Sequence, residues 1–254
     1  MKENTIVGDA FQRNIEGPRD IAAIIFDVDG TLYNQGAVRR NMAVELISAH
    51  CLRPAEGFAL YRFLSAYRKA QEKLRGSRLT GPASELQFLS ACQSTRTDPA
   101  RGRAYFERWF HSAPLKHIRA AVRPALVDFL SAMKSRGLKL GVLSDYPADS
   151  KLAALGIVGF FDAVVCADDA GVEGFKPDPS GLLLCAEKLG VAPPNVLYIG
   201  DRPEVDAECA HRAGAAAAIL QKNRPRPTDG AWLSAPTFAS LESELMRRDW
   251  IRTR

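Results

Sequence analysis

The sequence predicts an α/β fold with a mostly parallel sheet and an all-α cap domain inserted into it. From Val122 onwards, short apolar runs alternate with helical patterns, which is typical of βαβ units. Between residues 38 and 120, apolar residues recur at spacings of three and four, without strand-like alternation. These two patterns predict a discontinuous core, made of residues 20–36 and 120–254, and a helical cap over residues 37–119.

The strands of the core are expected where short apolar runs end in polar residues. The first is Ile24-Ile25-Phe26, and the others are expected at 138–144, 162–166, 196–200 and 215–220. Helices are expected at 124–133, 148–155, 179–189, 204–213 and 238–245. Pro124 and Gly137 flank the first of these helices, at the ends that these residue types favour. The tail from residue 247 is expected to fray, and 224–228 is expected to be a turn-rich loop.

Composition predicts a cytoplasmic protein without a membrane span. Of 254 residues, 46% are apolar and 25% charged, and no run approaches the ~18 apolar residues that a spanning helix needs. Residues 1–19 are polar, so we expect no signal peptide. The five cysteines are odd in number and scattered, which favours reduced thiols.

The positive charge of the chain is concentrated in the predicted cap. Residues 37–119 carry 15 Lys and Arg against 6 Asp and Glu, a net charge of +9 in a chain of net charge +5. A basic cap would steer an anionic substrate towards the core. Nucleic-acid binding is a competing explanation, but no recognition motif accompanies the charge, so none is expected. A solvated, Arg-rich helix face is the third explanation.

Two carboxylates follow the first strand at a spacing that places them on one side. Asp27 and Asp29 leave the strand two residues apart, in Asp-Val-Asp-Gly-Thr. Such a pair repels unless a cation or a shared proton relieves it, and Mg²⁺ prefers oxygen ligands of this kind. A simple Asp-Gly turn is the alternative reading of this stretch.

Other polar groups follow later apolar runs. They are Ser144-Asp145, Lys176 in Lys-Pro-Asp-Pro, and Gly200-Asp201 with Asp206 five residues on. In open α/β sheets, ligands bind at the carboxyl ends of the strands. We therefore expect these groups to converge on the two carboxylates.

Together these motifs resemble those of the haloacid dehalogenase-like hydrolases, of the phosphoglycolate phosphatase type with a helical cap after the first motif. The four motifs are carried by Asp27 to Thr31, by Ser144, by Lys176 and by Asp201 with Asp206. The resemblance implies a Rossmann-like, three-layer core. It also implies a Mg²⁺-dependent phosphatase that hydrolyses a small phosphorylated metabolite through an aspartyl-phosphate.

The resemblance also implies roles for individual residues. Asp27 would be the nucleophile, and Asp29 the general acid and then the base. Thr31, Ser144 and Lys176 would bind the phosphoryl oxygens.

The Mg²⁺ ligands implied by the resemblance are carboxylates of Asp27 and Asp201 and the backbone carbonyl of Asp29. Asp206 would orient Lys176 or a metal-bound water, or would cap a helix. Asp145 departs from the Asn that many relatives carry, and its role stays open.

Alternatives remain for the activity and the substrate. A phosphomutase keeps both acids, and a catalytically silent binding module can share the fold. Substrate specificity is expected from cap residues that face the core, with Tyr67, Arg68, Arg75 and Arg78 as candidates. The protein is expected to act as a monomer or a homodimer.

Overall fold

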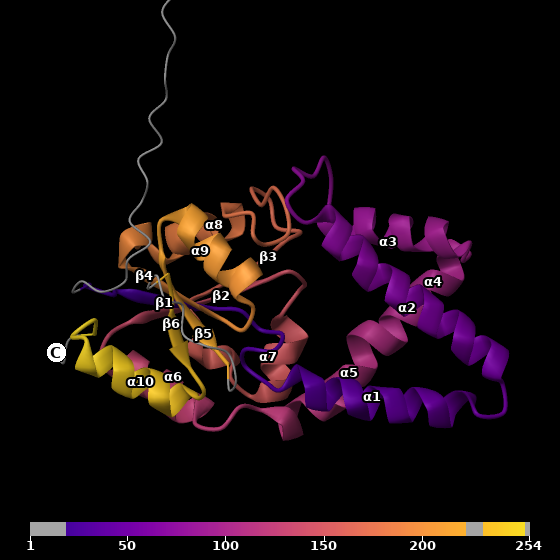
Figure 1. Cartoon of the computed structure of the whole chain (residues 1–254), viewed down its shortest axis with the longest axis horizontal. Helices are drawn as coiled ribbons and strands as arrows, with labels where there is room; N and C mark the ends of the chain where they lie inside the picture. The colour runs from indigo at the N-terminus through magenta and orange to yellow at the C-terminus, as the bar shows by residue number, and fades with distance from the viewer. Residues whose placement is uncertain (1–18, 222–230, 252–254) are drawn as a thin grey trace, which may run out of the picture.

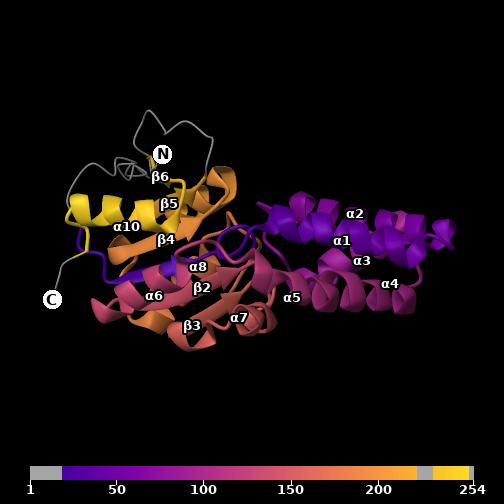
Figure 2. The same cartoon turned by 90° about the horizontal axis from the view of Figure 1, so that it is seen from below.

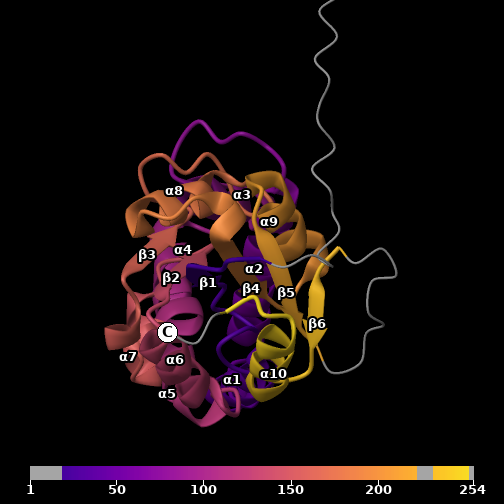
Figure 3. The same cartoon turned by 90° about the vertical axis from the view of Figure 1, so that its left-hand side faces the viewer.

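The computed structural model describes residues 19–221 and 231–251, and its centre is a six-stranded parallel sheet. The strand order is β3-β2-β1-β4-β5-β6, which Figure 3 shows from one side to the other. The strands are β1 (Ala23–Phe26), β2 (Lys139–Ser144), β3 (Ala163–Cys166), β4 (Val196–Gly200), β5 (Ala216–Leu220) and β6 (Leu233–Ala235). The α/β class predicted from the sequence is therefore confirmed.

Burial on both faces explains why these strands read as continuous apolar runs. Every residue of β1, β4 and β5 is buried, as expected for a parallel sheet covered by helices. The register places Phe26 beside Val142 of β2 and Ile199 of β4. The polar residues that follow these strands consequently leave the sheet at one edge.

Helices cover the two faces of the sheet as separate layers (Figures 1 and 3). One layer holds α6 (Leu126–Ser135), α7 (Asp149–Leu155) and α10 (Phe238–Arg247), which pack around Phe26 and Phe129. The other holds α8 (Ser180–Leu189) and α9 (Glu208–Ala213), with Cys185 and Cys209 in its core. Short helical turns lie between helices and strands: η3 (Val158–Phe160) before β3, η4 (Pro193–Asn195) before β4 and η5 (Pro203–Ala207) before α9.

A second group of helices lies beyond the carboxyl ends of the strands (Figures 1 and 2). It comprises α1 (Gln35–His50), α2 (Pro54–Leu74), α3 (Ala83–Thr95), α4 (Pro99–Phe106), η1 (Glu107–Ser112), α5 (Ala113–Ile118) and η2 (Arg119–Ala121). These helices share their own apolar cluster, in which Phe63 packs against Phe88 and Tyr105. The part of the chain described here has no helix long and apolar enough to span a membrane.

The structure departs from the sequence predictions at three places. Helix α6 begins at Leu126 rather than Pro124, because Ala125 takes a left-handed conformation (φ 59°). Strand β6 was not predicted, since three residues are too short for a clear pattern. The described part of the tail predicted to fray is anchored by Trp250 and Ile251, which are buried in the core, and 252–254 lie outside the described residues. The predicted loop 224–228 lies outside the described residues.

Candidate active site

The first motif forms a tight turn in which three residues surround the end of β1. Asp27 is buried, and one of its carboxylate oxygens accepts a hydrogen bond from the Thr31 hydroxyl at 2.8 Å. Gly30, with φ +100°, makes a turn that L side chains rarely adopt. The carbonyl of Gly30 in turn accepts two hydrogen bonds from the Arg123 guanidinium, at 2.5 and 3.0 Å. The turn is therefore fixed from both sides.

Lys176 is the cation that contacts Asp27. Its Nζ lies 2.5 Å from Asp27 Oδ1 and 2.9 Å from Asp206 Oδ1, and it donates to the Tyr198 hydroxyl at 3.0 Å. Burial opposes the charge on Lys176, but Asp206 and Asp27 outweigh it and raise the lysine pKa well above its usual value. Lys176 is thus held as a fixed positive charge.

The carboxylates outnumber this single cation. Burial raises the pKa of Asp27 to about 8; Lys176 opposes the rise, while Asp206 and Asp201 add to it. Burial, with repulsion from Asp206, also raises the pKa of Asp201 to about 6. The three aspartates place one oxygen each within 4.8 Å of one another. Such crowding favours a second cation at this point.

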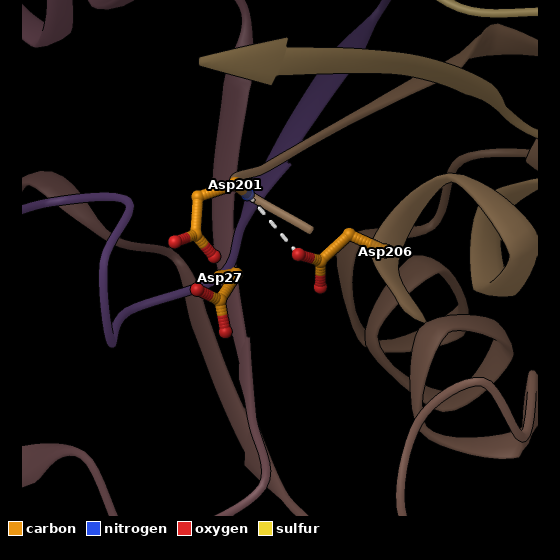
Figure 4. Close-up of side chains that lie close together, drawn as sticks. All are labelled: Asp27, Asp201 and Asp206. Carbon is orange, nitrogen blue, oxygen red and sulfur yellow. Dashed lines mark hydrogen bonds between the residues drawn. The ribbon is translucent and has the colours of Figure 1, made fainter. Parts of the chain in front are cut away.

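The hydrogen bonds show which of these oxygens could hold that cation (Figure 4). Asp206 uses both of its oxygens, one on Lys176 and the other on the backbone N–H groups of Asp201 and Arg202, at 3.1 and 3.0 Å. No residue within 19–221 and 231–251 donates a hydrogen bond to the Asp201 carboxylate. That carboxylate lies directly against Gly30, where an added Cβ would come within 2.2 Å of Asp201 Oδ2. Asp27 and Asp201 therefore present a donor set that fits a hard divalent ion.

Asp29 is paired with a cation that the sequence did not reveal. Lys151 of α7 donates to both oxygens of Asp29, at 2.8 and 2.5 Å, and the Tyr33 hydroxyl also donates to Asp29. Burial opposes ionisation of Asp29, but Lys151 and Tyr33 outweigh it and lower the pKa of the carboxyl group. Asp29 is therefore an anion held at the edge of the site.

Asp145, whose role the sequence left open, joins the helical segment to the core. Its carboxylate accepts from Gln71 Nε2 of α2 at 2.9 Å and pairs with Nη2 of Arg75, the residue that follows α2, at 2.8 Å. It also accepts the backbone N–H of Lys176 at 3.2 Å, and Arg75 donates to the carbonyl of the same residue. One ion pair thus connects α2 to the loop that carries Lys176.

A cavity of about 770 Å³ lies between the sheet and the helical segment. Asp27, Asp29, Lys176, Asp201 and Asp206 all line it, so the structure brings these predicted residues together.

Two predicted phosphoryl ligands lie outside this cavity lining. The Thr31 hydroxyl is directed at Asp27, and the Ser144 hydroxyl accepts the Tyr146 N–H at 3.2 Å. Both side chains are buried at the strand ends.

Of the four cap residues suggested for specificity, two line the cavity and two do not. Arg68 and Arg75 line the cavity. Tyr67 and Arg78 do not, which corrects the expectation: Tyr67 is 1% exposed within the helical cluster, and Arg78 is 79% exposed and pairs with Glu173. Tyr67 and Arg68 lie on α2, whereas Arg75 and Arg78 follow its end at Leu74, and sequence spacing could not tell which of the four face the core.

Sequence reasoning also missed residues that contact the site. Lys151 could have been suspected from its place seven residues after Ser144, and Tyr33 from its place two residues after the first motif. Arg39 and Arg202 line the cavity without any motif to mark them.

The fold and these motifs define a class of hydrolases, and comparison with known proteins identifies it. The chain belongs to the haloacid dehalogenase-like hydrolases, whose family model matches residues 21–214. This confirms the resemblance drawn from the four motifs.

Individual relatives cover most of the chain. It is 31% identical to the glyceraldehyde 3-phosphate phosphatase of Methanopyrus kandleri, over 80% of this chain and 85% of that protein. It is 28% identical to the phosphoglycolate phosphatase of Shigella dysenteriae, over 77% and 79%. Among solved structures, magnesium-bound YfnB, a HAD-hydrolase of Bacillus subtilis, superimposes with a TM-score of 0.66 at 16% identity, over 90% of this chain and 100% of that one.

Proposed function

We propose that this protein is a Mg²⁺-dependent phosphatase that hydrolyses a small phosphorylated metabolite through an aspartyl-phosphate. One observation carries the proposal: Asp27 lies against Lys176 and Thr31 in a cavity that Asp29 and Asp201 share. The two relatives compared above by sequence are named as phosphatases, which supports a phosphoric monoester hydrolase.

The residues supply each part of a two-step hydrolysis. Asp27 attacks phosphorus, a new O–P bond forms, and the bond from phosphorus to the leaving oxygen breaks. Asp29 is ionised in the free site, so it first takes up the proton of a monoanionic phosphate ester. It then gives that proton to the leaving oxygen, so the alcohol departs neutral. Water then attacks the phosphorus of the aspartyl-phosphate, Asp29 takes the proton of the water, and phosphate leaves Asp27 free. Lys176 neutralises charge on Asp27 and the phosphoryl group.

We assign the metal to Asp27, Asp201 and the backbone carbonyl of Asp29. A Mg²⁺ ion there would neutralise the charge that builds up between an anionic nucleophile and an anionic phosphoryl group. Asp206 takes a supporting role in this proposal, because both of its oxygens are already used on Lys176 and on backbone N–H groups. In the same proposal residues 37–119 act as a cap over a core made of 20–36 and 120–254.

Replacing the nucleophile tests the proposal directly. Asp27→Asn should lower phosphate release by several orders of magnitude, the scale seen when a catalytic unit is broken. Asp128→Asn, an exposed substitution on α6, is the matched control and should keep the parent rate. Activity of Asp27→Asn above ~10% of the parent would refute the nucleophile assignment. Transfer of the phosphoryl group to a second position, without free phosphate, would instead indicate a mutase.

A further inference from the structure

The hairpin formed by α1 and α2 projects away from the core. Figures 1 and 2 both show the turn between these helices at the end of the molecule that lies farthest from the sheet. The turn is tight, because the backbone N–H of Arg53 donates to the carbonyl of His50 at 2.9 Å. His50 also packs on Gly57, where an added Cβ would come within 2.8 Å of the His50 Cβ. The two helices therefore stay in contact up to the end of the hairpin.

Five large apolar side chains are exposed along this hairpin. They are Val44 and Ile47 of α1, Leu52 of the turn, and Phe58 and Tyr61 of α2, and we call them the apolar tip. Their exposed fractions run from 60% to 92%, above those of every other large apolar side chain in the described parts of the chain. Ile47 and Tyr61 line the same cavity, so the exposed residues of the two helices lie on neighbouring faces. Apolar side chains gathered on one exposed surface indicate a site of interaction.

The same two helices carry cations that have no acidic partner. Their three acids, Glu45, Glu56 and Glu72, all pair with basic residues. Six of their cations make no ion pair with any residue of 19–221 and 231–251: Arg39, Arg40, Arg62, Arg68, Lys69 and Lys73. Arg39 and Arg68 line the cavity, and the other four are exposed outside it. The hairpin therefore presents an excess of positive charge to its surroundings.

These cations adjoin the apolar tip. Arg40 lies one helical turn before Val44 on α1, and Arg62 lies one turn after Phe58 on α2. Lys69 follows Arg62 by two turns, about 10 Å along the same side of the helix. Apolar side chains at an exposed end, followed by cations, suit the surface of an anionic bilayer. The apolar groups enter the boundary of the acyl chains, and the cations stay at the lipid phosphates.

Other partners suit these side chains less well. A nucleic acid would bind the cations, but it would leave the aliphatic side chains of Val44, Ile47 and Leu52 in water. A second copy of this chain would cover the apolar tip, but a two-fold contact would bring the unpaired cations of both copies together. Such like charges repel across an interface. Only an anionic lipid surface satisfies both kinds of side chain.

We propose that the α1–α2 hairpin docks on an anionic lipid bilayer. The apolar tip lies at the acyl boundary, and Arg40, Arg62 and Lys69 contact the headgroups. This contact goes beyond the proposed phosphatase function and does not depend on it, because these three cations lie outside the cavity lining.

Sedimentation of the full chain with lipid vesicles tests the proposal. The vesicles contain equal amounts of phosphatidylcholine and phosphatidylglycerol, and vesicles of phosphatidylcholine alone are the neutral comparison. We expect binding to the anionic vesicles to be tighter by about tenfold or more, and to weaken as the salt concentration rises. Leu52→Ser and Phe58→Ser should each lower the affinity by about tenfold, since each removes buried apolar surface. Arg62→Gln should lower it by about fivefold.

Matched control variants come from other surfaces. Val127 of α6 is 47% exposed, so Val127→Ser should keep the parent affinity for the vesicles. Arg119 is exposed and has no ion-pair partner within the described residues, and Arg119→Gln should also keep that affinity. Melting curves of the two tip variants should match the parent, because Leu52 and Phe58 are exposed. A loss of vesicle binding at an unchanged Tm then reflects the docking surface alone.

Two results would overturn the proposal. The first is vesicle binding that Leu52→Ser and Phe58→Ser leave unchanged, since another surface would then be responsible. The second is no binding to the anionic vesicles. In that case a dimer in solution that the two serine variants dissociate would assign the apolar tip to a second copy. Binding of double-stranded DNA that Arg62→Gln weakens would assign the cations to a nucleic acid.

Discussion

Gly30 is the position where one added methyl group should displace a proposed metal ligand and so raise the Mg²⁺ concentration that activity requires. In Gly30→Ala the new Cβ would lie 2.2 Å from Asp201 Oδ2 and 2.7 Å from Cγ, so the Asp201 carboxylate must rotate away. Displacing one proposed ligand should raise the Mg²⁺ concentration for half-maximal activity by 10- to 100-fold, on the order of the losses seen when a metal site is perturbed. The φ of +100° adds backbone strain of about 2 kcal/mol, which should lower the Tm by about 4–8 °C.

The assay is a Mg²⁺ titration of phosphate release, with melting curves measured in parallel. Gly171→Ala is the matched control, because Gly171 has a φ of +93° and no atom within 4 Å of an added Cβ. It should show a similar loss of Tm with an unchanged Mg²⁺ requirement. If Gly30→Ala requires no more Mg²⁺ than Gly171→Ala, Asp201 does not hold the metal and the ligand assignment is wrong.

Three further predictions follow from other contacts. EDTA should abolish phosphate release, and Mg²⁺ should restore it. Ca²⁺ should be a poor substitute because it prefers more ligands at longer distances. Full activity in the presence of chelator would contradict the metal assignment. Arg75→Gln should lower kcat/KM for all phosphate esters alike, because it breaks the ion pair with Asp145 beside the loop that carries Lys176. The control Arg78→Gln, at an exposed residue, should leave kcat/KM unchanged. A loss confined to charged esters would instead indicate that Arg75 contacts the substrate. Hydrogen bonds from Arg247 and Arg248 lower the pKa of Glu244 to about 2. The ionised Glu244 therefore stabilises the folded state fully above pH ~4.5, and this stabilisation is lost as the pH falls towards 2. Glu244→Gln should lower the free energy of unfolding by up to about 1 kcal/mol at pH 7, and denaturant titrations should show that difference closing over this pH range.

The core was predictable because its signals are local. Parallel strands buried on both faces leave unbroken apolar runs, and β1, β2 and β4 lie close to where those runs indicated. The carboxyl ends of neighbouring strands meet at one edge, so Asp27 and Asp201 could be expected together although 174 positions separate them. Each prediction needed only the pattern around one strand and a general rule of topology.

The contacts between the helical segment and the core were not predictable in this way. Periodicity shows that α2 is amphipathic, but it does not show which stripe faces its own helical neighbours and which faces the cavity. Tyr67 and Arg68 are adjacent in sequence, yet one is buried in the helical cluster and the other lines the cavity. The pairs of Asp145 with Arg75 and of Asp29 with Lys151 join residues 70 and 122 positions apart, and no local rule relates them.

Negative and positive charges lie in different parts of the cavity, and this separation affects how a negatively charged ester would approach Asp27. Around Asp27, three buried carboxylates face one lysine, an excess of negative charge that would repel a phosphate ester on its own. Further out, Arg39 and Arg68 give an excess of positive charge that attracts the same ester. A divalent ion at Asp27 and Asp201 would cancel this excess of two negative charges, so that the inner site no longer repels the ester that the arginines attract. The basic helical segment and the acidic core would therefore both accept an anionic ester only when the metal is bound. Removing the ion should weaken phosphate binding as well as turnover.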